Sequence, residues 1–279
     1  MKIVLGLRRS LKISLLCCSL CVTWSHSAYA FEPNRTQEPN PLHHKVAVII
    51  DDFGNGQKGT DEMLSMPVKL TVAVMPFLTT SHRDAELAYK RGYDVLVHMP
   101  MEPKSGNVRW LGPGAITSNL SDVEIRKRIE DAIDDIPHAV GMNNHMGSRI
   151  TGDERIMTIV LQICKERGLI FVDSHTNYRS VVSKLATQMG MPVIENNIFL
   201  DDVHTSSHIT KQLQAVENWA MEHEICVTIG HVGTQGDKTA AALKSRIPDM
   251  KKRVQFVSVS ELAKTKGWTP APILPSNNQ

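Results

Sequence analysis

The chain has 279 residues and a formal net charge of +2, from 31 Lys and Arg against 29 Asp and Glu. Four of the basic residues lie within the first 30 positions, so the rest of the chain carries 27 basic against 29 acidic residues. With no basic cluster in that remainder, nucleic acid is excluded as an expected partner. Of five cysteines only Cys164 and Cys226 lie beyond residue 30, which excludes a disulfide framework and leaves open a single bridge.

The first 30 residues have the features of a secretory signal peptide. Basic residues precede the apolar run 13–22, which ends near the cleavage pattern Ala28-Tyr29-Ala30. The run is short for a bilayer span, so we predict an exported periplasmic or extracellular protein without a stable membrane anchor. The polar segments 31–44 and 268–279 are predicted to be a flexible linker and a flexible tail.

Residues 45–267 alternate between short apolar runs and longer stretches of helical periodicity. The candidate strands are residues 46–50, 70–75, 94–97, 139–142, 169–172, 193–200 (with a polar middle), 225–229 and 254–257. Capping boxes at Ser121 and Thr151 predict the starts of two helices. Strands that alternate with helices form parallel sheets. We therefore predict an α/β fold, a single parallel (β/α) barrel of seven or eight strands in one domain of roughly 225 residues.

Polar residues follow most of these strands. They are Asp51 and Asp52; His98; Asn143, Asn144 and His145; Asp173, Ser174 and His175; Asp201 and Asp202; and His231. The carboxyl ends of parallel strands open on one face of a barrel, so we expect these groups to converge there. Carboxylates and imidazoles bind Zn²⁺ and similar ions. Asp201 and Asp202, taken alone, are assigned to helix capping and turn formation.

The adjacent acids Asp51 and Asp52 pose a geometric question. Side chains alternate along a strand, so the two carboxylates can take the same direction only where the strand has begun to turn.

Five motifs carry a resemblance to a known family: IIDDFG (49–54), VHMPMEP (97–103), NNHMGS (143–148), FVDSHT (171–176) and IGH (229–231). Together they resemble the divergent polysaccharide deacetylase family, a distant branch of the NodB-type carbohydrate esterases, over roughly residues 45–267. The NNHMGS motif is specific, whereas a bare pair of aspartates is a weak signal.

The resemblance implies roles for four residues. Asp51 resembles the general base, Asp52 a metal ligand, His98 the first ligand histidine and His231 the general acid. It also implies a divalent metal, with zinc expected, and hydrolysis of an N-acetyl group on an envelope glycan without a covalent enzyme intermediate.

The sequence departs from the family pattern at Glu102, which stands where a second histidine would complete H-x-x-x-H after His98. His145 is the preferred third ligand, with His175 and Glu102 as alternatives. The Arg-x-Pro-Tyr element of the parent esterases has no counterpart, unless Arg149 serves from another place. Asn144 joins these residues as a candidate for contact with the substrate or with the ligands.

Two other functions remain open at this stage. A barrel with an incomplete ligand set could bind a glycan or an envelope partner without hydrolysing it, and Trp110, in the loop after His98, could stack on a sugar ring or pack as a lid. Paired carboxylates, Asp52 with Asp173, could instead hydrolyse glycosidic bonds without a metal, but the accompanying histidines then have no role. The oligomeric state is not predicted.

Overall fold

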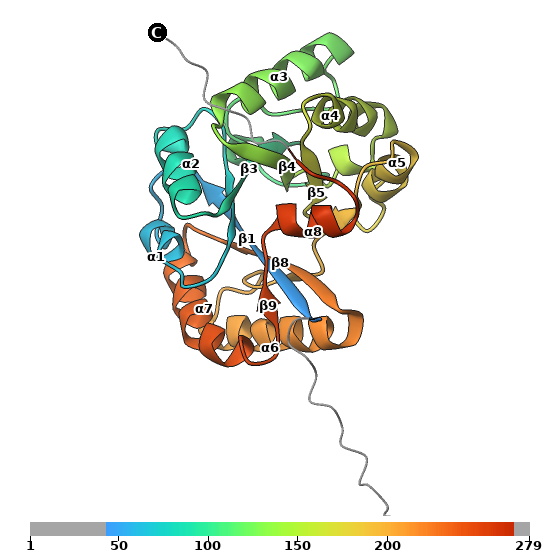
Figure 1. Ribbon diagram of the computed structural model, residues 1–279. Helices are drawn as coiled ribbons and strands as arrows, with labels where there is room; N and C mark the ends of the chain where they lie inside the picture. The colour runs from blue at the N-terminus through green and yellow to red at the C-terminus, as the bar shows by residue number, and fades with distance from the viewer. Residues whose placement is uncertain (1–42, 271–279) are drawn as a thin grey trace, which may run out of the picture. The chain divides into compact units, whose positions relative to one another are not determined.

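The computed structural model describes residues 43–270, which form the expected parallel (β/α) barrel as a curled half-barrel that stays open between β6 and β7, with helices around it (Figure 1). The signal peptide and most of the linker and tail predicted from the sequence lie outside the described residues. The strand order is β6-β5-β4-β3-β2-β1-β8-β7, every pairing is parallel, and β9 adds to β1 beside this path.

The elements follow one another as strand and helix along most of the chain. The strands are β1 (Lys45–Phe53), β2 (Thr71–Val74), β3 (Asp94–Met101), β4 (Ala139–Met146), β5 (Ile170–Asp173), β6 (Ile194–Glu195), β7 (Ile198–Phe199), β8 (Ile225–His231) and β9 (Gln255–Phe256). The helices are α1 (Thr60–Leu64), α2 (Ser81–Lys90), α3 (Asp122–Asp135), α4 (Glu154–Glu166), α5 (Val182–Gln188), α6 (Ser206–His223), α7 (Gly236–Met250) and α8 (Val259–Thr265), with short 3₁₀ turns η1 (Val108–Trp110) and η2 (Ile150–Gly152).

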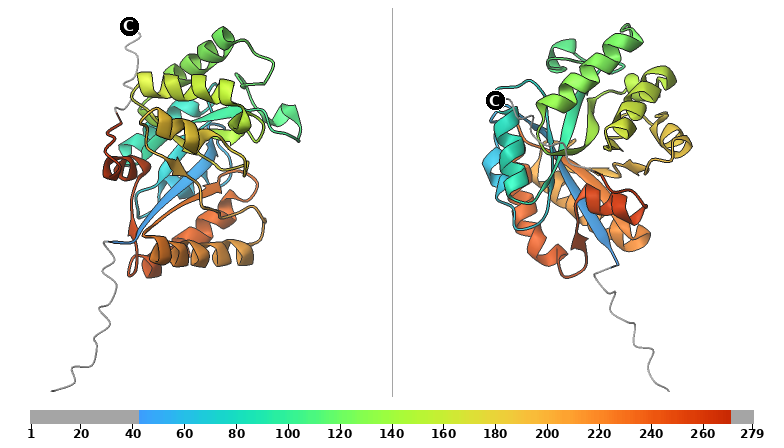
Figure 2. Two further views of the ribbon diagram at one scale, coloured as in Figure 1. Left: turned by 90° about the vertical axis from the view of Figure 1, so that its right-hand side faces the viewer. Right: turned by 45° about the horizontal axis from the view of Figure 1, so that its top comes forward.

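The strands separate two hydrophobic cores. On β1 the side chains of Val46, Val48 and Ile50 pack outward against the helices, whereas Ala47 and Ile49 belong to a smaller core inside the barrel. This alternation is the period of two expected of a strand buried on both faces. Figure 2 shows the helices arranged around the outside of the sheet.

Helix α8 closes the amino end of the barrel. Its residues Val259 and Leu262 belong to the inner core, and the backbone N–H of Val259 donates to the Thr71 hydroxyl at the start of β2. The backbone N–H of Ser260 donates to Asp94 at the start of β3, at 2.7 Å. The carboxyl ends of the strands are therefore the open end.

The segment predicted as one strand over residues 193–200 is divided in two. Its first part, β6, pairs with β5, and its second part, β7, pairs with β8. Between them Asn196 N–H donates to the Asp173 carbonyl and Asn197 N–H donates to the Val227 carbonyl, each at 2.9 Å. The polar middle noted in the sequence is thus the point where the chain passes from one edge of the sheet to the other.

Five strands continue further than the apolar runs predict. The runs predict that β1, β3, β4, β5 and β8 end at residues 50, 97, 142, 172 and 229, but these strands include Asp51, His98, Asn143, Asp173 and His231. The reason is that backbone pairing continues beyond the apolar residues, with Asp51 opposite His231 and His98 opposite Asn143.

The helix starts are partly as predicted. Ser121 caps α3 by accepting the N–H of Glu124 at 3.3 Å. Thr151 was wrongly predicted to cap the next helix: it lies in η2, its hydroxyl donates to the Gly147 carbonyl, and Asp153 caps α4 instead.

Cys164 and Cys226 are both buried and free, as small hydrophobic residues would be. None of the helices within residues 43–270 combines the length and the apolar character needed to cross a membrane.

Candidate metal centre and catalytic site

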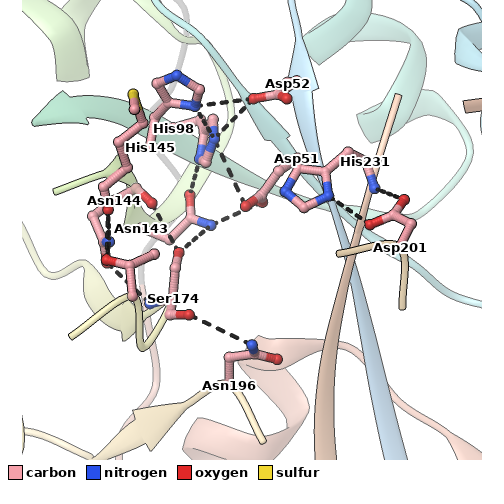
Figure 3. A network of polar contacts seen from close by, with 12 residues as sticks. Asp51, Asp52, His98, Asn143, Asn144, His145, Ser174, Asn196, Asp201 and His231 are labelled. Atoms are coloured by element: carbon pink, nitrogen blue, oxygen red, sulfur yellow. Dashed lines mark hydrogen bonds and ion pairs between the residues drawn. The ribbon is translucent and has the colours of Figure 1, made fainter. Parts of the chain in front are cut away.

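The two adjacent carboxylates of β1 reach the same region because the strand is irregular at its end. The register with β2 shifts between Ile50 and Phe53, and Asp52 has a left-handed backbone with φ of 70°. Irregularities of this kind re-aim a side chain at the end of a strand. Asp51 therefore keeps the inward direction of Ile49, and Asp52 turns toward the histidines beside it (Figure 3).

Three ligand atoms from three strands form a nearly equilateral triangle. Asp52 Oδ1 lies 3.2 Å from His98 Nε2 and 3.0 Å from His145 Nδ1, and the two nitrogens are 3.1 Å apart. Ligands at about 2.0–2.1 Å from a tetrahedral zinc ion lie roughly 3.3 Å from one another. Within residues 43–270, Asp52, His98 and His145 are the side chains whose ligand atoms lie close enough together to hold one metal ion.

The hydrogen bonds around the ligand triangle fit a cation. Asp52 Oδ1 is buried and accepts no hydrogen bond from the described residues. The other ring nitrogen of each histidine has a partner: His98 Nδ1 lies 2.8 Å from Asn143 Oδ1, and His145 Nε2 lies 3.2 Å from the Trp110 carbonyl. Histidines that bind metals donate the outer N–H in this way, which leaves a lone pair on the inner nitrogen. Two such lone pairs 3.1 Å apart repel each other unless a cation lies between them.

Burial and neighbouring charges shift the pKa values of Asp52 and His98 in opposite directions. Burial disfavours the charge of Asp52, but the ring nitrogens of His145 and His98 outweigh it and hold the pKa of this carboxyl well below its usual range. Burial also disfavours protonated His98, yet the charge of Asp51 and the contact with Asp52 raise the pKa of the imidazole. The group is thus poised to hold positive charge at its centre.

Asp51 lies beside the ligand triangle without belonging to it. Its Oδ1 accepts a hydrogen bond from Asn143 Nδ2 at 2.9 Å, and its Oδ2 lies 3.7 Å from His98 Nε2. Burial raises the pKa of Asp51, against the opposing effect of the His98 and His231 charges. A carboxylate in this position, with a raised proton affinity, can accept a proton from a water molecule near the triangle.

His231 lies on the other side of Asp51 (Figure 3). Its Nδ1 is 2.7 Å from Asp201 Oδ1, its backbone N–H donates to Asp201 Oδ2 at 2.9 Å, and Thr239 donates to that same oxygen. Burial would lower the pKa of His231, but the hydrogen bond with Asp201 and the charges of Asp52 and Asp51 raise it to about 9. Burial likewise works against ionised Asp201, and the contact with His231 outweighs it and lowers the pKa. His231 therefore carries a proton at neutral pH.

Asn144 does not face the ligand triangle. Its Oδ1 accepts the backbone N–H of Ser174 at 2.9 Å, and its Nδ2 donates to the Met146 carbonyl at 2.7 Å. It ties the ends of β4 and β5 together, which holds the backbone next to His145.

Glu102 and Arg149 pair with each other, outside the ligand triangle. Arg149 Nε lies 3.0 Å from Glu102 Oε1, while Glu102 Oε2 accepts the backbone N–H of Ser118 at 2.7 Å. The glutamate that replaces the second histidine of H-x-x-x-H thus fastens the loop after β3 to the loop after β4.

Asp173 and His175 organise the loop after β5. Both carboxylate oxygens of Asp173 are engaged, by Ser180 Oγ at 2.5 Å and by the His175 N–H at 2.8 Å, and burial raises its pKa. His175 Nδ1 lies 3.3 Å from the Asn196 carbonyl. Of the alternatives for the third ligand, only His145 lies in the triangle.

Trp110 contributes to the site in two separate ways. Its carbonyl oxygen contacts His145, whereas its side chain is 67% exposed.

An open cavity of about 270 Å³ adjoins Asp52 and His231. Its further walls come from the loops after β7 and β8, among them Asp202, His204 and Gln235.

Two residues that support the site were not identified from the sequence. Asp201 was assigned to helix capping, but it holds His231; its position directly after a strand was the signal available. Asn143 was noted among the polar residues after the strands and in the NNHMGS motif but was given no role, yet it contacts both Asp51 and His98.

Comparison with known proteins places the chain among related sequences. A family model described as divergent polysaccharide deacetylase matches residues 48–263. An uncharacterized protein of Haemophilus influenzae is 31% identical over 231 residues, which cover 83% of this chain and 79% of that protein. The uncharacterized protein YibQ of Escherichia coli K12 is 31% identical over 221 residues, 79% of this chain and 68% of that one. The solved structure of an uncharacterized protein from Agrobacterium tumefaciens C58 is similar with a TM-score of 0.74 at 20% identity, over 79% of this chain and 89% of that one, which shows a shared fold.

Proposed function

Because the chain belongs to the divergent polysaccharide deacetylase family, we propose that it is a zinc-dependent hydrolase that removes N-acetyl groups from an envelope glycan. The observation that carries this proposal is the ligand triangle, in which a carboxylate oxygen and two imidazole nitrogens lie 3.0–3.2 Å apart. The outer nitrogens of both histidines have hydrogen-bond partners, so the inner ones are free to bind a metal.

Asp52, His98 and His145 would hold the metal. A zinc ion bound there would supply a water of lowered pKa and would polarise the acyl carbonyl. Zinc fits because two imidazoles and one carboxylate, with an open position left over, are typical of catalytic zinc sites.

Asp51 and His231 divide the proton transfers. Asp51 accepts the proton of the attacking water, since its carboxylate lies next to the triangle without belonging to it. His231, held by Asp201 on the other side of Asp51, donates a proton to the departing amine. The amide and one water are thereby converted to acetate and a free amino sugar, with no covalent intermediate.

The predicted signal peptide supports an envelope or extracellular glycan as the substrate. Trp110 has an exposed indole and a carbonyl that contacts His145, which supports a sugar ring as the group placed beside the triangle.

The first test is the metal content of residues 31–279, purified as wild type and as Asp52→Ala and His98→Ala. We expect one zinc or similar ion per wild-type chain and a large loss in both variants, because each removes one of three protein ligands. A wild type that stays metal-free after reconstitution would refute the hydrolase and favour a glycan-binding protein.

The second test separates binding of the metal from turnover. Asp51→Asn should retain the metal but release acetate from N-acetylated chitooligosaccharides at least about 100-fold more slowly, as expected for loss of a general base. Normal turnover in this variant would refute the role of Asp51.

A further inference from the structure

Asn143 connects two groups that have different tasks in the proposed reaction. Its Oδ1 lies 2.8 Å from His98 Nδ1, and its Nδ2 lies 2.9 Å from Asp51 Oδ1. Asn143 is fully buried, and a third and longer contact of 3.4 Å joins its Nδ2 to Ser174 Oγ. One short side chain therefore bridges a candidate metal ligand and the candidate base (Figure 3).

The direction of these hydrogen bonds is fixed by chemistry. An ionised carboxylate only accepts, so the NH₂ group of Asn143 must face Asp51 and its carbonyl oxygen must face His98. That oxygen can only accept, so His98 carries its proton on Nδ1. The lone pair of His98 is then on Nε2, the atom that lies in the ligand triangle.

The backbone holds Asn143 in this position. His98 and Asn143 are partners in the register of β3 and β4, and Asp51 lies on the inward face of β1 above Ile49. A side chain on a paired strand is placed more rigidly than one on a loop. Arg149, the residue considered as a counterpart of the Arg-x-Pro-Tyr element, pairs with Glu102 instead.

We propose that Asn143 is a positioning residue that sets both the tautomer of His98 and the orientation of Asp51 through one neutral amide. The part that concerns Asp51 rests on the proposed function, whereas the part that concerns His98 is a property of the chain alone. A neutral amide achieves this without adding charge next to two carboxylates and two imidazoles.

The test compares a variant that removes both hydrogen bonds with a variant that removes only the one to Asp51. Asn143→Leu has a similar size and removes both hydrogen bonds. Asn143→Asp keeps an acceptor for His98 but removes the N–H donor to Asp51. Ser174→Ala is the control: it removes the long third contact to the amide and the 2.9 Å hydrogen bond from Ser174 Oγ to the Asn144 carbonyl, but neither contact of Asn143 with His98 or Asp51.

Three quantities are measured on residues 31–279. Metal affinity comes from competition with a chelator, and turnover comes from acetate release. The protonated ring nitrogen of His98 comes from long-range ¹H–¹⁵N spectra of the metal-free protein, recorded at a pH where His98 is neutral. The His98 signals are assigned with His98→Gln, and thermal unfolding reports whether each variant folds.

The proposal predicts a split between the variants. Asn143→Leu should bind zinc about 10- to 100-fold more weakly, as for other residues that orient metal-binding histidines, and should lose the Nδ1–H signature of His98. Asn143→Asp should keep zinc affinity within about threefold and that signature, but should lose turnover by about 100-fold or more. Ser174→Ala should resemble the wild type in all three measurements. A residue that served only the fold would not separate metal affinity from turnover.

Other results overturn the proposal. Wild-type zinc affinity in Asn143→Leu, normal turnover in Asn143→Asp, or an equal loss of affinity in both would each do so. If Asn143→Leu does not fold, the Asn143→Asp variant and the wild-type spectra decide, since a neutral His98 with its proton on Nε2 in the wild type also contradicts the proposal. A wild type that binds no metal or releases no acetate refutes the proposed function instead, and the spectra still decide the His98 tautomer.

Discussion

Replacing Asp201 with asparagine removes the negative charge that holds His231, and the effect on His231 is predictable. In the wild type the pKa of His231 is raised from 6.5 to about 9, chiefly by the 2.7 Å contact of its Nδ1 with Asp201 and further by the charges of Asp52 and Asp51. An opposite charge at this distance shifts a pKa by about 1–3 units. In Asp201→Asn we therefore expect the pKa of His231 to fall by roughly one to two units.

The assay is an NMR titration of the His231 ring in the metal-free protein, with the resonance assigned by His231→Gln. The metal-free protein is required because a bound cation would change the charges that His231 experiences. A midpoint near 6.5 in the wild type, or an unchanged midpoint in Asp201→Asn, would refute the role given to Asp201.

The same contact makes a prediction about stability. A histidine whose pKa is higher in the folded than in the unfolded protein contributes stability that is fully present below pH 6.5 and is lost as the pH rises through about 9. The difference in the free energy of urea unfolding between wild type and Asp201→Asn should therefore be larger at pH 6 than at pH 9.5. Asp201, whose pKa is lowered, remains ionised at both values. A difference that does not change with pH would contradict this linkage.

Two further substitutions test other parts of the structure. Trp110→Ala should leave zinc affinity unchanged, because only the carbonyl of Trp110 contacts His145. If the exposed indole stacks on the sugar, the substitution should raise KM roughly three- to tenfold in acetate-release kinetics. An unchanged KM would place the indole outside the substrate site. Gly141→Ala would place a Cβ 2.4 Å from Ile170 Cγ1 and 2.7 Å from the Ile170 carbonyl oxygen. We therefore expect the free energy of unfolding in urea to fall by about 1–3 kcal/mol. Wild-type stability would show that β4 and β5 are not packed as closely as described.

The barrel and the convergence of its polar residues could be predicted because both depend on local patterns. Apolar runs mark the strands, and parallel strands bring their carboxyl ends to one face, so residues as distant as Asp52, His98 and His145 were expected to meet. The ends of the strands were placed too early, because the apolar pattern stops where the backbone pairing of His98 with Asn143 continues.

The partners of individual side chains could not be predicted in the same way. Asp201 as a helix cap and Asp201 as the partner of His231 have the same local sequence, and only a contact across 30 residues distinguishes them. Glu102 could have completed the ligand set by its spacing alone. Its pairing with Arg149 and Ser118 depends on how two loops meet above the barrel, which no local pattern specifies.

The divided segment Ile194–Phe199 has a consequence for how this barrel behaves in a crowded compartment. Both edges of the sheet path belong to this one stretch, and each edge strand is only two residues long. A long exposed edge is a template on which another chain can add a strand and begin aggregation, whereas an edge this short gives an incoming strand little to pair with. Separation of β6 from β5 would lengthen the exposed edge to the four residues of β5. The amide hydrogens of Asn196 and Asn197, which donate to the two sides of this junction, are therefore the positions where hydrogen exchange would report this opening.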